Sequence, residues 1–230
     1  MINTVIDRMR DNPQAVADPA VKAALESLKA TAEANATPSV DSEARGPLDV
    51  ERKVLSELEG GEYPKRHREG LKSMTGPGLK KAEELLPKVK KDAMLLLAGT
   101  RGNGKTQLAT YLAYHRLLTH GLTAGKYIKA LDLFEALKET WSNRSSEDSI
   151  MRPYRQCGML VIDEIHERGE SEWETRKLVN LIDHRYDRML VTLLVGNIAP
   201  NEVTARLSPS IVSRMKETGG IINCDWPSYR

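Results

Sequence analysis

Gly99-Thr-Arg-Gly-Asn-Gly-Lys-Thr106 fits the pattern G-x-x-x-x-G-K-[ST]. The stretch follows a fully apolar run, residues 93–98, and precedes a segment with apolar residues at helical spacing. Glycines allow a loop between a strand and a helix to turn its backbone N–H groups inward around phosphate oxygens. The positive end of the helix dipole strengthens that attraction. The stretch therefore predicts a P-loop that binds a nucleoside triphosphate.

The polar residues of this loop have separate tasks in such a site. We expect the ammonium group of Lys105 to contact the β- and γ-phosphates and the hydroxyl group of Thr106 to bind Mg²⁺. An ordinary glycine turn is the alternative, and the complete spacing with Gly-Lys-Thr disfavours it. The candidate residues for binding the nucleotide are Gly99, Arg101, Gly102, Asn103, Gly104, Lys105, Thr106 and Asp163.

An acidic pair follows a second apolar run. Met159-Leu-Val-Ile162 is typical of a buried strand, and Asp163 and Glu164 come directly after it, 58 residues beyond Lys105. A carboxylate at that strand end would hold the water shell of Mg²⁺, so Asp163 joins Thr106 as a metal-binding candidate. Glu164 is the candidate base that orients an attacking water molecule. A solvated acidic pair is the alternative, but an acidic pair that follows a P-loop favours ATP hydrolysis. The sequence has no N-K-x-D motif, which reads guanine, so GTP is disfavoured as the nucleotide.

Two kinds of polar residue further along the chain are candidates for contacts with the γ-phosphate. Asn197 follows the apolar run 191–195, and its amide would hydrogen-bond the phosphate and the attacking water, although an asparagine in an ordinary turn is the alternative. Arg206 and Arg214 come later, and a guanidinium group in this region would reach the nucleotide of a neighbouring subunit. A surface arginine is the alternative for both, and Arg214 is the stronger candidate. Glu164, Asn197 and Arg214 are therefore the catalytic candidates.

Apolar runs alternate with helical periodicity from residue 93 onwards. Strands are expected over residues 93–98, 126–129, 159–162, 191–195 and 220–224. Helices are expected between them, over 131–140 and within 171–189, whereas the polar stretch 141–148 is expected to be a loop. The alternation predicts an α/β fold of the P-loop NTPase type, with a parallel sheet covered by helices on both faces.

The first fifty residues differ in composition from the rest and carry five basic and eight acidic side chains. Asp18-Pro19 is typical of a helix start, and apolar residues at helical spacing follow it, so residues 1–30 are expected to form a helical partner-binding region. Residues 31–50 lack apolar periodicity and indicate a linker, which leaves 51–230 as the ATPase domain. The N-terminal helix either packs on this domain or docks on another protein.

Composition narrows the class of protein further. The 230 residues are 40% hydrophobic and carry a formal net charge of +2, so the chain can bury a core but needs a local patch to contact nucleic acid. Trp141 beside Arg144, and Arg152 with Arg155, are candidate contacts for single-stranded DNA, a solvated surface being the alternative. Two cysteines exclude a four-cysteine zinc site. The longest apolar run is far short of the roughly 20 residues that span a bilayer, so we expect a soluble, cytoplasmic protein without membrane contact.

The order of P-loop, intervening strand, Asp-Glu pair and polar-tipped strand resembles the AAA+ ATPases. The ending, in which Trp226-Pro-Ser-Tyr-Arg230 follows Gly219-Gly-Ile-Ile-Asn-Cys-Asp225, resembles the DnaC/IstB branch of that class. This branch comprises bacterial and phage loaders of replicative helicases and the ATP-binding helpers of some transposases. The resemblance covers residues 93–230 well and residues 64–92 more loosely.

The resemblance implies an ATP-controlled loader that holds a ring-shaped hexameric helicase through its N-terminal region and places it on single-stranded DNA. It implies self-association through AAA+ interfaces, with ATP and Mg²⁺ as cofactors. Carried over by position, Lys105 and Thr106 match the Walker A pair and Asp163 and Glu164 the Walker B pair. Asn197 matches sensor 1, and Arg214 matches an arginine finger. An ATP-binding helper of a transposase is the alternative function, and the sequence leaves a bacterial or a phage origin open.

Overall fold

A computed structural model describes residues 47–89, 92–120, 125–143, 145–169, 171–199 and 201–226. The predicted helical region 1–30 and the predicted linker up to residue 46 lie outside the described residues, as do Arg144 and the tail residues 227–230. The first described element, helix α3 (Pro47–Gly60), begins four residues before the predicted domain boundary at residue 51.

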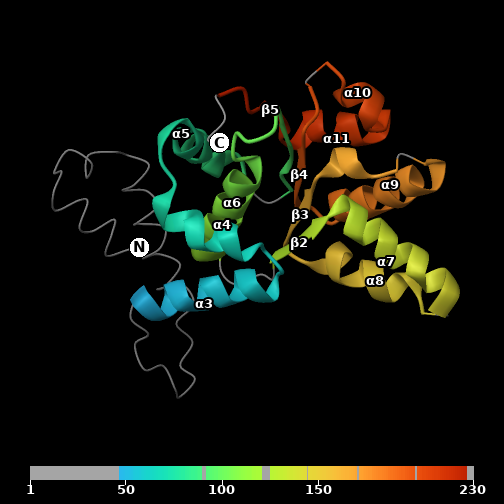
Figure 1. The fold of residues 1–230 in the computed structure, drawn as a ribbon, viewed down its shortest axis with the longest axis horizontal. Helices are drawn as coiled ribbons and strands as arrows, with labels where there is room; N and C mark the ends of the chain where they lie inside the picture. Colours follow the sequence, from blue (N-terminus) through green and yellow to red (C-terminus); the bar gives the residue numbers. More distant parts are fainter. Residues whose placement is uncertain are drawn as a thin grey trace.

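Five parallel strands form one sheet in the described part of the chain, in the order β2-β3-β4-β1-β5 (Figure 1). Their bounds are β1 Met94–Ala98, β2 Gly125–Lys129, β3 Met159–Asp163, β4 Val191–Gly196 and β5 Gly220–Asn223. Each strand differs from its expected range by a single residue at one end. The predicted parallel α/β architecture is therefore confirmed.

The apolar strands of the sequence occupy the middle of the sheet. Every residue of β1, β3 and β4 is buried, whereas the edge strands β2 and β5 are partly exposed. Strands that are covered on both faces need apolar side chains at successive positions, which explains runs such as MLLLA. The register pairs Ala98 with Gly196 and Lys129 with Asp163, so the carboxyl ends of four strands meet at one edge of the sheet.

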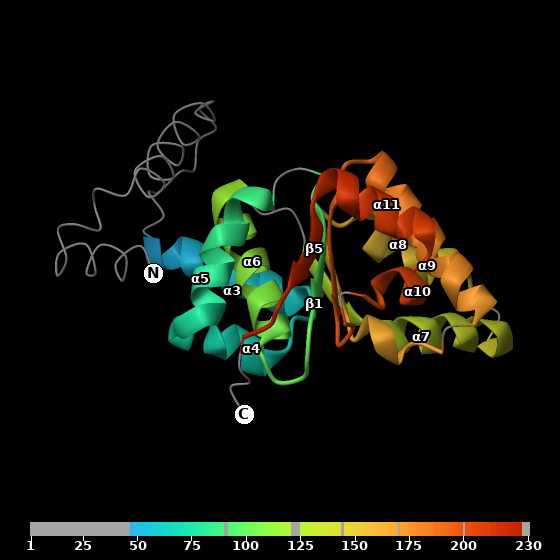
Figure 2. The same cartoon turned by 90° about the horizontal axis from the view of Figure 1, so that it is seen from above.

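Helices cover both faces of the sheet (Figure 2). One face carries α3, α4 (Lys65–Glu69), α5 (Gly76–Leu85) and α6 (Lys105–His120). The other carries α7 (Ala130–Asn143), α8 (Glu147–Gln156), α9 (Glu172–Asp187), α10 (Val203–Arg206) and α11 (Pro209–Thr218). Short 3₁₀ helices, η2 (Gly70–Ser73), η3 (Leu86–Lys88) and η4 (Ile165–Glu167), complete the chain. Within β1, Leu95 and Leu97 face the first layer and Leu96 faces the second, because successive side chains of a strand point to opposite faces.

The predicted loop over residues 141–148 is wrong. Helix α7 continues to Asn143 and α8 begins at Glu147. The aromatic ring of Trp141 packs edge-on against Trp173 at 5.0 Å between ring centroids, which extends α7 beyond its polar-looking end. Ser146 caps α8 by accepting a hydrogen bond from the backbone N–H of Asp148. Serine followed by acidic residues is a helix-start signal, and polarity alone conceals it.

Candidate nucleotide-binding site

A cavity of about 600 Å³ lies at the carboxyl edge of the sheet, between the loops that follow β1, β3 and β4 and the segment from α4 to α5. The predicted site residues that line it are Arg101, Gly102, Asn103, Gly104, Lys105, Thr106, Asp163, Glu164 and Asn197. Gly99 and Arg214 are not among its lining residues. The structure thus brings nine predicted residues, from three separate loops, around one space.

The loop between β1 and α6 has the backbone that its glycines predict. Gly102 and Gly104 have φ angles of 86° and 80°, in the left-handed region that other residues avoid. Helix α6 begins at Lys105, so its free N–H groups and the positive end of its dipole face the loop. This geometry suits an anion such as a phosphate group.

The ammonium group of Lys105 lies folded back over this loop. Its Nζ donates to the carbonyl oxygens of Gly99 at 3.1 Å and Thr100 at 2.5 Å, and to Oδ1 of Asn103 at 3.0 Å. Burial lowers the pKa of Lys105, and the nearby Asp163 carboxylate acts in the opposite direction. All three acceptors are neutral, so the charged oxygens of a triphosphate would be stronger partners for the same ammonium group.

The segment that follows β5 braces the loop from behind. Asn103 donates its side-chain N–H to the carbonyl oxygen of Cys224, and its own carbonyl accepts a hydrogen bond from the indole Nε1 of Trp226 at 2.6 Å. A Cβ atom on Gly99 would lie 2.3 Å from the same Cys224 oxygen. Gly99 therefore supports the loop by allowing this close approach, although it does not line the cavity.

Thr106 and Asp163 meet at the bottom of the cavity. The Thr106 hydroxyl donates to Oδ2 of Asp163 at 2.7 Å, and the Tyr127 hydroxyl of β2 donates to the same oxygen at 2.9 Å. Burial, reinforced by Asp163, raises the pKa of Tyr127, which keeps that hydroxyl a donor. Sequence reasoning missed Tyr127, because its position beside Asp163 depends on the pairing of β2 with β3.

These oxygen atoms fit a magnesium ion. Carboxylate and hydroxyl oxygens are the donors that Mg²⁺ prefers, and it usually keeps several waters and phosphate oxygens as its remaining ligands. No cluster of three His, Cys, Asp or Glu side chains that could hold a metal ion occurs in the described ranges. Thr106 and Asp163 would therefore hold the ion together with the nucleotide, as the sequence predicts.

Glu164 lies beside the magnesium-binding pair and is held by a neighbour that the sequence analysis missed. Its backbone is left-handed, with φ 52°, and its Oε2 lies 2.9 Å from Nζ of Lys129 at the end of β2. The hydrogen bond to Glu164 raises the pKa of Lys129. The ion pair occupies the carboxylate that is predicted to orient water, so Glu164 has to leave Lys129 before it can take that role.

Asn197 follows the last residue of β4 and contacts His166 in η4. The backbone N–H of Asn197 donates to Nδ1 of His166 at 3.1 Å, and its side-chain amide lies 3.0 Å from Nε2. Burial lowers the pKa of His166. Glu167, the residue after His166, forms an ion pair with Arg101 of the loop between β1 and α6 at 3.1 Å. His166 is the third residue near the site, after Tyr127 and Lys129, that sequence reasoning missed, and it lines the cavity.

Arg214 lies away from the cavity, on α11. Its guanidinium group pairs with Asp183 of α9 at 3.1 Å, donates to the Ser210 hydroxyl at 2.9 Å and lies over the Tyr186 ring at 5.2 Å from the centroid. Arg214 therefore does not reach the nucleotide cavity of its own chain. A role toward a neighbouring subunit remains a prediction.

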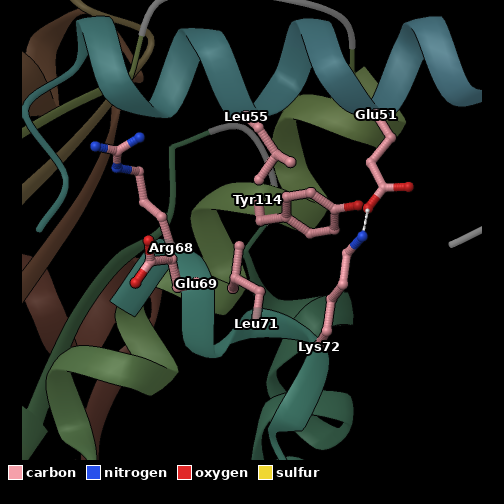
Figure 3. Close-up of a pocket in the computed structure, with 7 residues that line it drawn as sticks. All are labelled: Glu51, Leu55, Arg68, Glu69, Leu71, Lys72 and Tyr114. Atoms are coloured by element: carbon pink, nitrogen blue, oxygen red, sulfur yellow. Dashed lines mark ion pairs between the residues drawn. The ribbon is translucent and has the colours of Figure 1, made fainter. Parts of the chain in front are cut away.

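A second, smaller cavity lies between α3, α4, η2 and α6 (Figure 3). Its volume is about 280 Å³, and it shares no lining residue with the nucleotide cavity. Its charged residues are paired, Lys72 with Glu51 at 3.3 Å and Arg68 with Glu59 of α3 at 3.0 Å. Tyr114, one of its lining residues, is fully buried, and its hydroxyl has no hydrogen-bond partner among the described residues. Paired charges give this cavity no preference for an anion or a cation.

The strand order, the P-loop after β1 and the acidic pair after β3 define the AAA+ class of P-loop ATPases. A family model described as IstB-like ATP binding protein matches residues 81–212, more than half of the chain. The chain belongs to this family of ATP-binding proteins, in its DnaC/IstB-type branch.

Individual relatives agree with this assignment. The chain is 29% identical over 140 residues to the replicative helicase loader DnaC of Escherichia coli K12. This alignment covers 60% of this chain and 56% of that protein. It is 28% identical over 134 residues to the uncharacterized protein YdaV of the same strain, covering 58% and 53%. The matches thus span little more than half the length of these relatives.

Solved structures share the fold. A crystal structure of the DnaC helicase loader superposes with a TM-score of 0.60 at 19% identity, over 70% of this chain and 99% of that one. DnaA from Aquifex aeolicus bound to AMPPCP gives 0.54 at 18% identity, over 67% and 49%. Among the described residues, none of the helices combines the length and apolar character that crossing a membrane requires.

Proposed function

We propose that this protein is an ATP-dependent loader that binds a hexameric replicative helicase and delivers it onto single-stranded DNA, with ATP binding and hydrolysis controlling release. The observation that carries the proposal is the grouping of Lys105, Thr106, Asp163 and Glu164 around one cavity in a chain similar to DnaC. The similarity to a helicase loader suggests the helicase as the partner, and the residues of the cavity suggest that ATP binding and hydrolysis control its release.

Each residue of the cavity has a task in this proposal. The loop amides and Lys105 bind the β- and γ-phosphates, and Thr106 and Asp163 hold Mg²⁺, which neutralises phosphate charge when bound. Glu164, released from Lys129, orients the attacking water and takes up its proton. Asn197 donates to the γ-phosphate or to that water. Replacing Glu164 with Gln should leave ATP bound without turnover, and unchanged hydrolysis in that variant would reject its role.

Single-stranded DNA would contact the face formed by α7 and α9. The Trp141 side chain is 64% exposed and packs on Trp173, and the ammonium groups of Lys138 and Lys177 lie 5.9 and 5.8 Å from the centroid of the Trp173 ring. Lys138 pairs with Glu174 at 2.6 Å and Lys177 pairs with Glu147, so a phosphate would have to displace these carboxylates. The exposed Trp141 ring, which suits a stacked base, therefore carries the proposed contact. This placement keeps Trp141 as the predicted contact, while its predicted neighbour Arg144 lies outside the described residues.

Two variants of helix α7 test this placement. Trp141→Ala should weaken binding of a fluorescent oligonucleotide by about 1–3 kcal/mol, the usual value of one stacked base. Leu131→Ala, which removes another exposed apolar side chain of the same helix, should leave the affinity unchanged. Equal affinities for wild type and Trp141→Ala would reject this surface.

The loader proposal is tested by capture of its partner. The full-length protein, purified with and without ATP, should retain a ring helicase from its host, and a chain without residues 1–45 should bind ATP but lose the helicase. Helicase retained by the truncated chain would contradict binding through the N-terminal region. The name of the matching family favours one second candidate, an ATP-binding helper of a transposase. Capture of a transposase in place of a helicase would select it.

Self-association is proposed to place Arg214 beside the nucleotide of a neighbouring subunit. The guanidinium group would first have to leave Asp183. If it acts across an interface, mixing Arg214→Ala with Lys105→Ala should restore part of the hydrolysis that each variant lacks alone, because some interfaces then combine an intact loop with an intact arginine. No recovery on mixing would argue against the arginine-finger role.

A further inference from the structure

His166 offers both of its ring nitrogens to a single residue. The ring is part of η4, lines the nucleotide cavity and is 13% exposed. Nδ1 lies 3.1 Å from the backbone nitrogen of Asn197, and Nε2 lies 3.0 Å from the side-chain atom of Asn197 that is placed as Nδ2. Oε1 of Glu167 lies 3.6 Å from Nε2, which is too far for a hydrogen bond. Asn197 is therefore the partner of the ring.

The backbone contact decides where the proton of His166 lies. A backbone N–H can only donate, so Nδ1 accepts and carries no proton. Burial lowers the pKa of His166 and keeps the ring neutral, although Glu167 and Glu164 act in the opposite direction and Arg101 and Lys105 reinforce it. A neutral imidazole has one N–H group. That proton is consequently on Nε2, which donates.

The proton on Nε2 in turn decides how the amide of Asn197 faces. An amide NH₂ group accepts no hydrogen bond, whereas its oxygen accepts two. The two ends of an amide are nearly equal in size, and their hydrogen-bond partners determine which is which. Hydrogen-bond chemistry therefore assigns Oδ1 to the position 3.0 Å from Nε2 of His166, in place of Nδ2, and it puts the NH₂ group on the opposite side of the amide. Asn197 itself lines the cavity.

We propose that His166 is a positioning residue that fixes the amide of Asn197 so that its NH₂ group donates into the nucleotide cavity. The proposal rests on the proposed ATP hydrolysis. Without the imidazole, the amide can turn over and present its oxygen to the γ-phosphate, where the partial negative charge of the amide oxygen is repelled by the phosphate oxygens. Held by the ring, it presents a donor to the phosphate oxygen or to the attacking water.

The fold makes room for this contact at Gly196. A Cβ atom there would lie 2.8 Å from Cγ2 of Ile165, the neighbour of His166, and 3.2 Å from Cδ1 of Ile198. A larger residue would push η4 away from the end of β4 and lengthen the two hydrogen bonds. The glycine at position 196 and the histidine at position 166 thus belong to one arrangement.

The test begins with the tautomer in the full-length protein. Nitrogen-15 NMR of the labelled imidazole should show the proton of His166 on Nε2, and a proton on Nδ1 would overturn the proposal whether or not the protein hydrolyses ATP. The second measurement is a double-mutant cycle in steady-state hydrolysis. His166→Leu and Asn197→Ala should each lower kcat about tenfold to a hundredfold, with the KM for ATP nearly unchanged. The double variant should be no slower than Asn197→Ala alone.

Conservative replacement separates positioning from a structural role. His166→Gln keeps a side-chain N–H donor and should recover much of kcat, whereas His166→Leu should not. If the wild type hydrolyses ATP and the losses in kcat of the two single variants multiply in the double variant, the role of His166 is overturned and the proposed function stands. A wild type that binds ATP without any hydrolysis would overturn both.

Discussion

Acid should destabilise this protein through one histidine of the helix that carries the nucleotide loop. His115 lies on α6, against the rings of Tyr111 and Tyr114, at 4.4 and 5.6 Å between centroids. Its buried Nε2 has no hydrogen-bond partner in the part of the chain that the structure describes. Burial lowers the pKa of His115 from 6.5 to about 4. The folded protein therefore accommodates only the neutral ring over most of the acidic range.

The sign and size of the effect follow from these two values. Between pH 6.5 and 4 the unfolded chain binds a proton that the folded chain does not, so the free energy of unfolding falls as the pH falls. The contribution is fully present above pH 6.5 and is lost on the way to pH 4. At about 1.4 kcal/mol per pH unit, the loss amounts to about 3 kcal/mol.

Replacing His115 with Phe isolates this contribution. Phenylalanine keeps a ring between the two tyrosines but has no proton to bind, while every other titrating group is common to both proteins. Urea unfolding of wild type and His115→Phe at pH 7, 5.5 and 4.5 should give a stability difference that shifts in favour of the variant as the pH falls. Parallel stability curves over this range would refute the reasoning.

Three further substitutions have defined outcomes. Lys129→Ala frees the carboxylate of Glu164 from a partly exposed ion pair worth about 1 kcal/mol or less, so basal hydrolysis should rise about two- to fivefold, whereas Lys129→Arg should not raise it. Tyr114→Phe removes a buried hydroxyl that has no partner among the described residues, so urea unfolding should show unchanged or slightly greater stability. A loss of stability above about 1 kcal/mol would indicate that the Tyr114 hydroxyl makes a hydrogen bond after all. Gly99→Ala places a Cβ atom against the Cys224 carbonyl, at a residue whose φ is 144°, and should lower the free energy of unfolding by about 2–4 kcal/mol. A loss below about 1 kcal/mol would contradict the close approach of Cys224 to the loop.

The sequence predicted best what depends on short stretches of chain. The P-loop, its position between β1 and α6, and the start of α6 at Lys105 all follow from residues within one turn of each other. The three central strands, β1, β3 and β4, followed from their mainly apolar residues, because strands covered on both faces carry few polar side chains. The polar residues of 141–148 led to the wrong prediction of a loop, because Ser146 and the acidic residues after it start a helix.

Contacts between distant strands were beyond the sequence. Tyr127 and Lys129 reach Asp163 and Glu164 because β2 pairs with β3 in a particular register, and alternation along β2 places both side chains on one face. His166 reaches Asn197 only because η4 folds back over the end of β4. A single sequence shows such residues as ordinary members of a strand or turn.

The hydrogen bond from the Trp226 indole to the Asn103 carbonyl gives this molecule a built-in optical reporter. The chain has three tryptophans, and the other two, Trp141 and Trp173, pack edge-to-face against each other on the far side of the sheet. Any rearrangement of the loop backbone alters the surroundings of the Trp226 ring, while the pair across the sheet emits a steady background. Titrating the unlabelled protein with nucleotide while following its intrinsic emission therefore reads out the state of the loop directly.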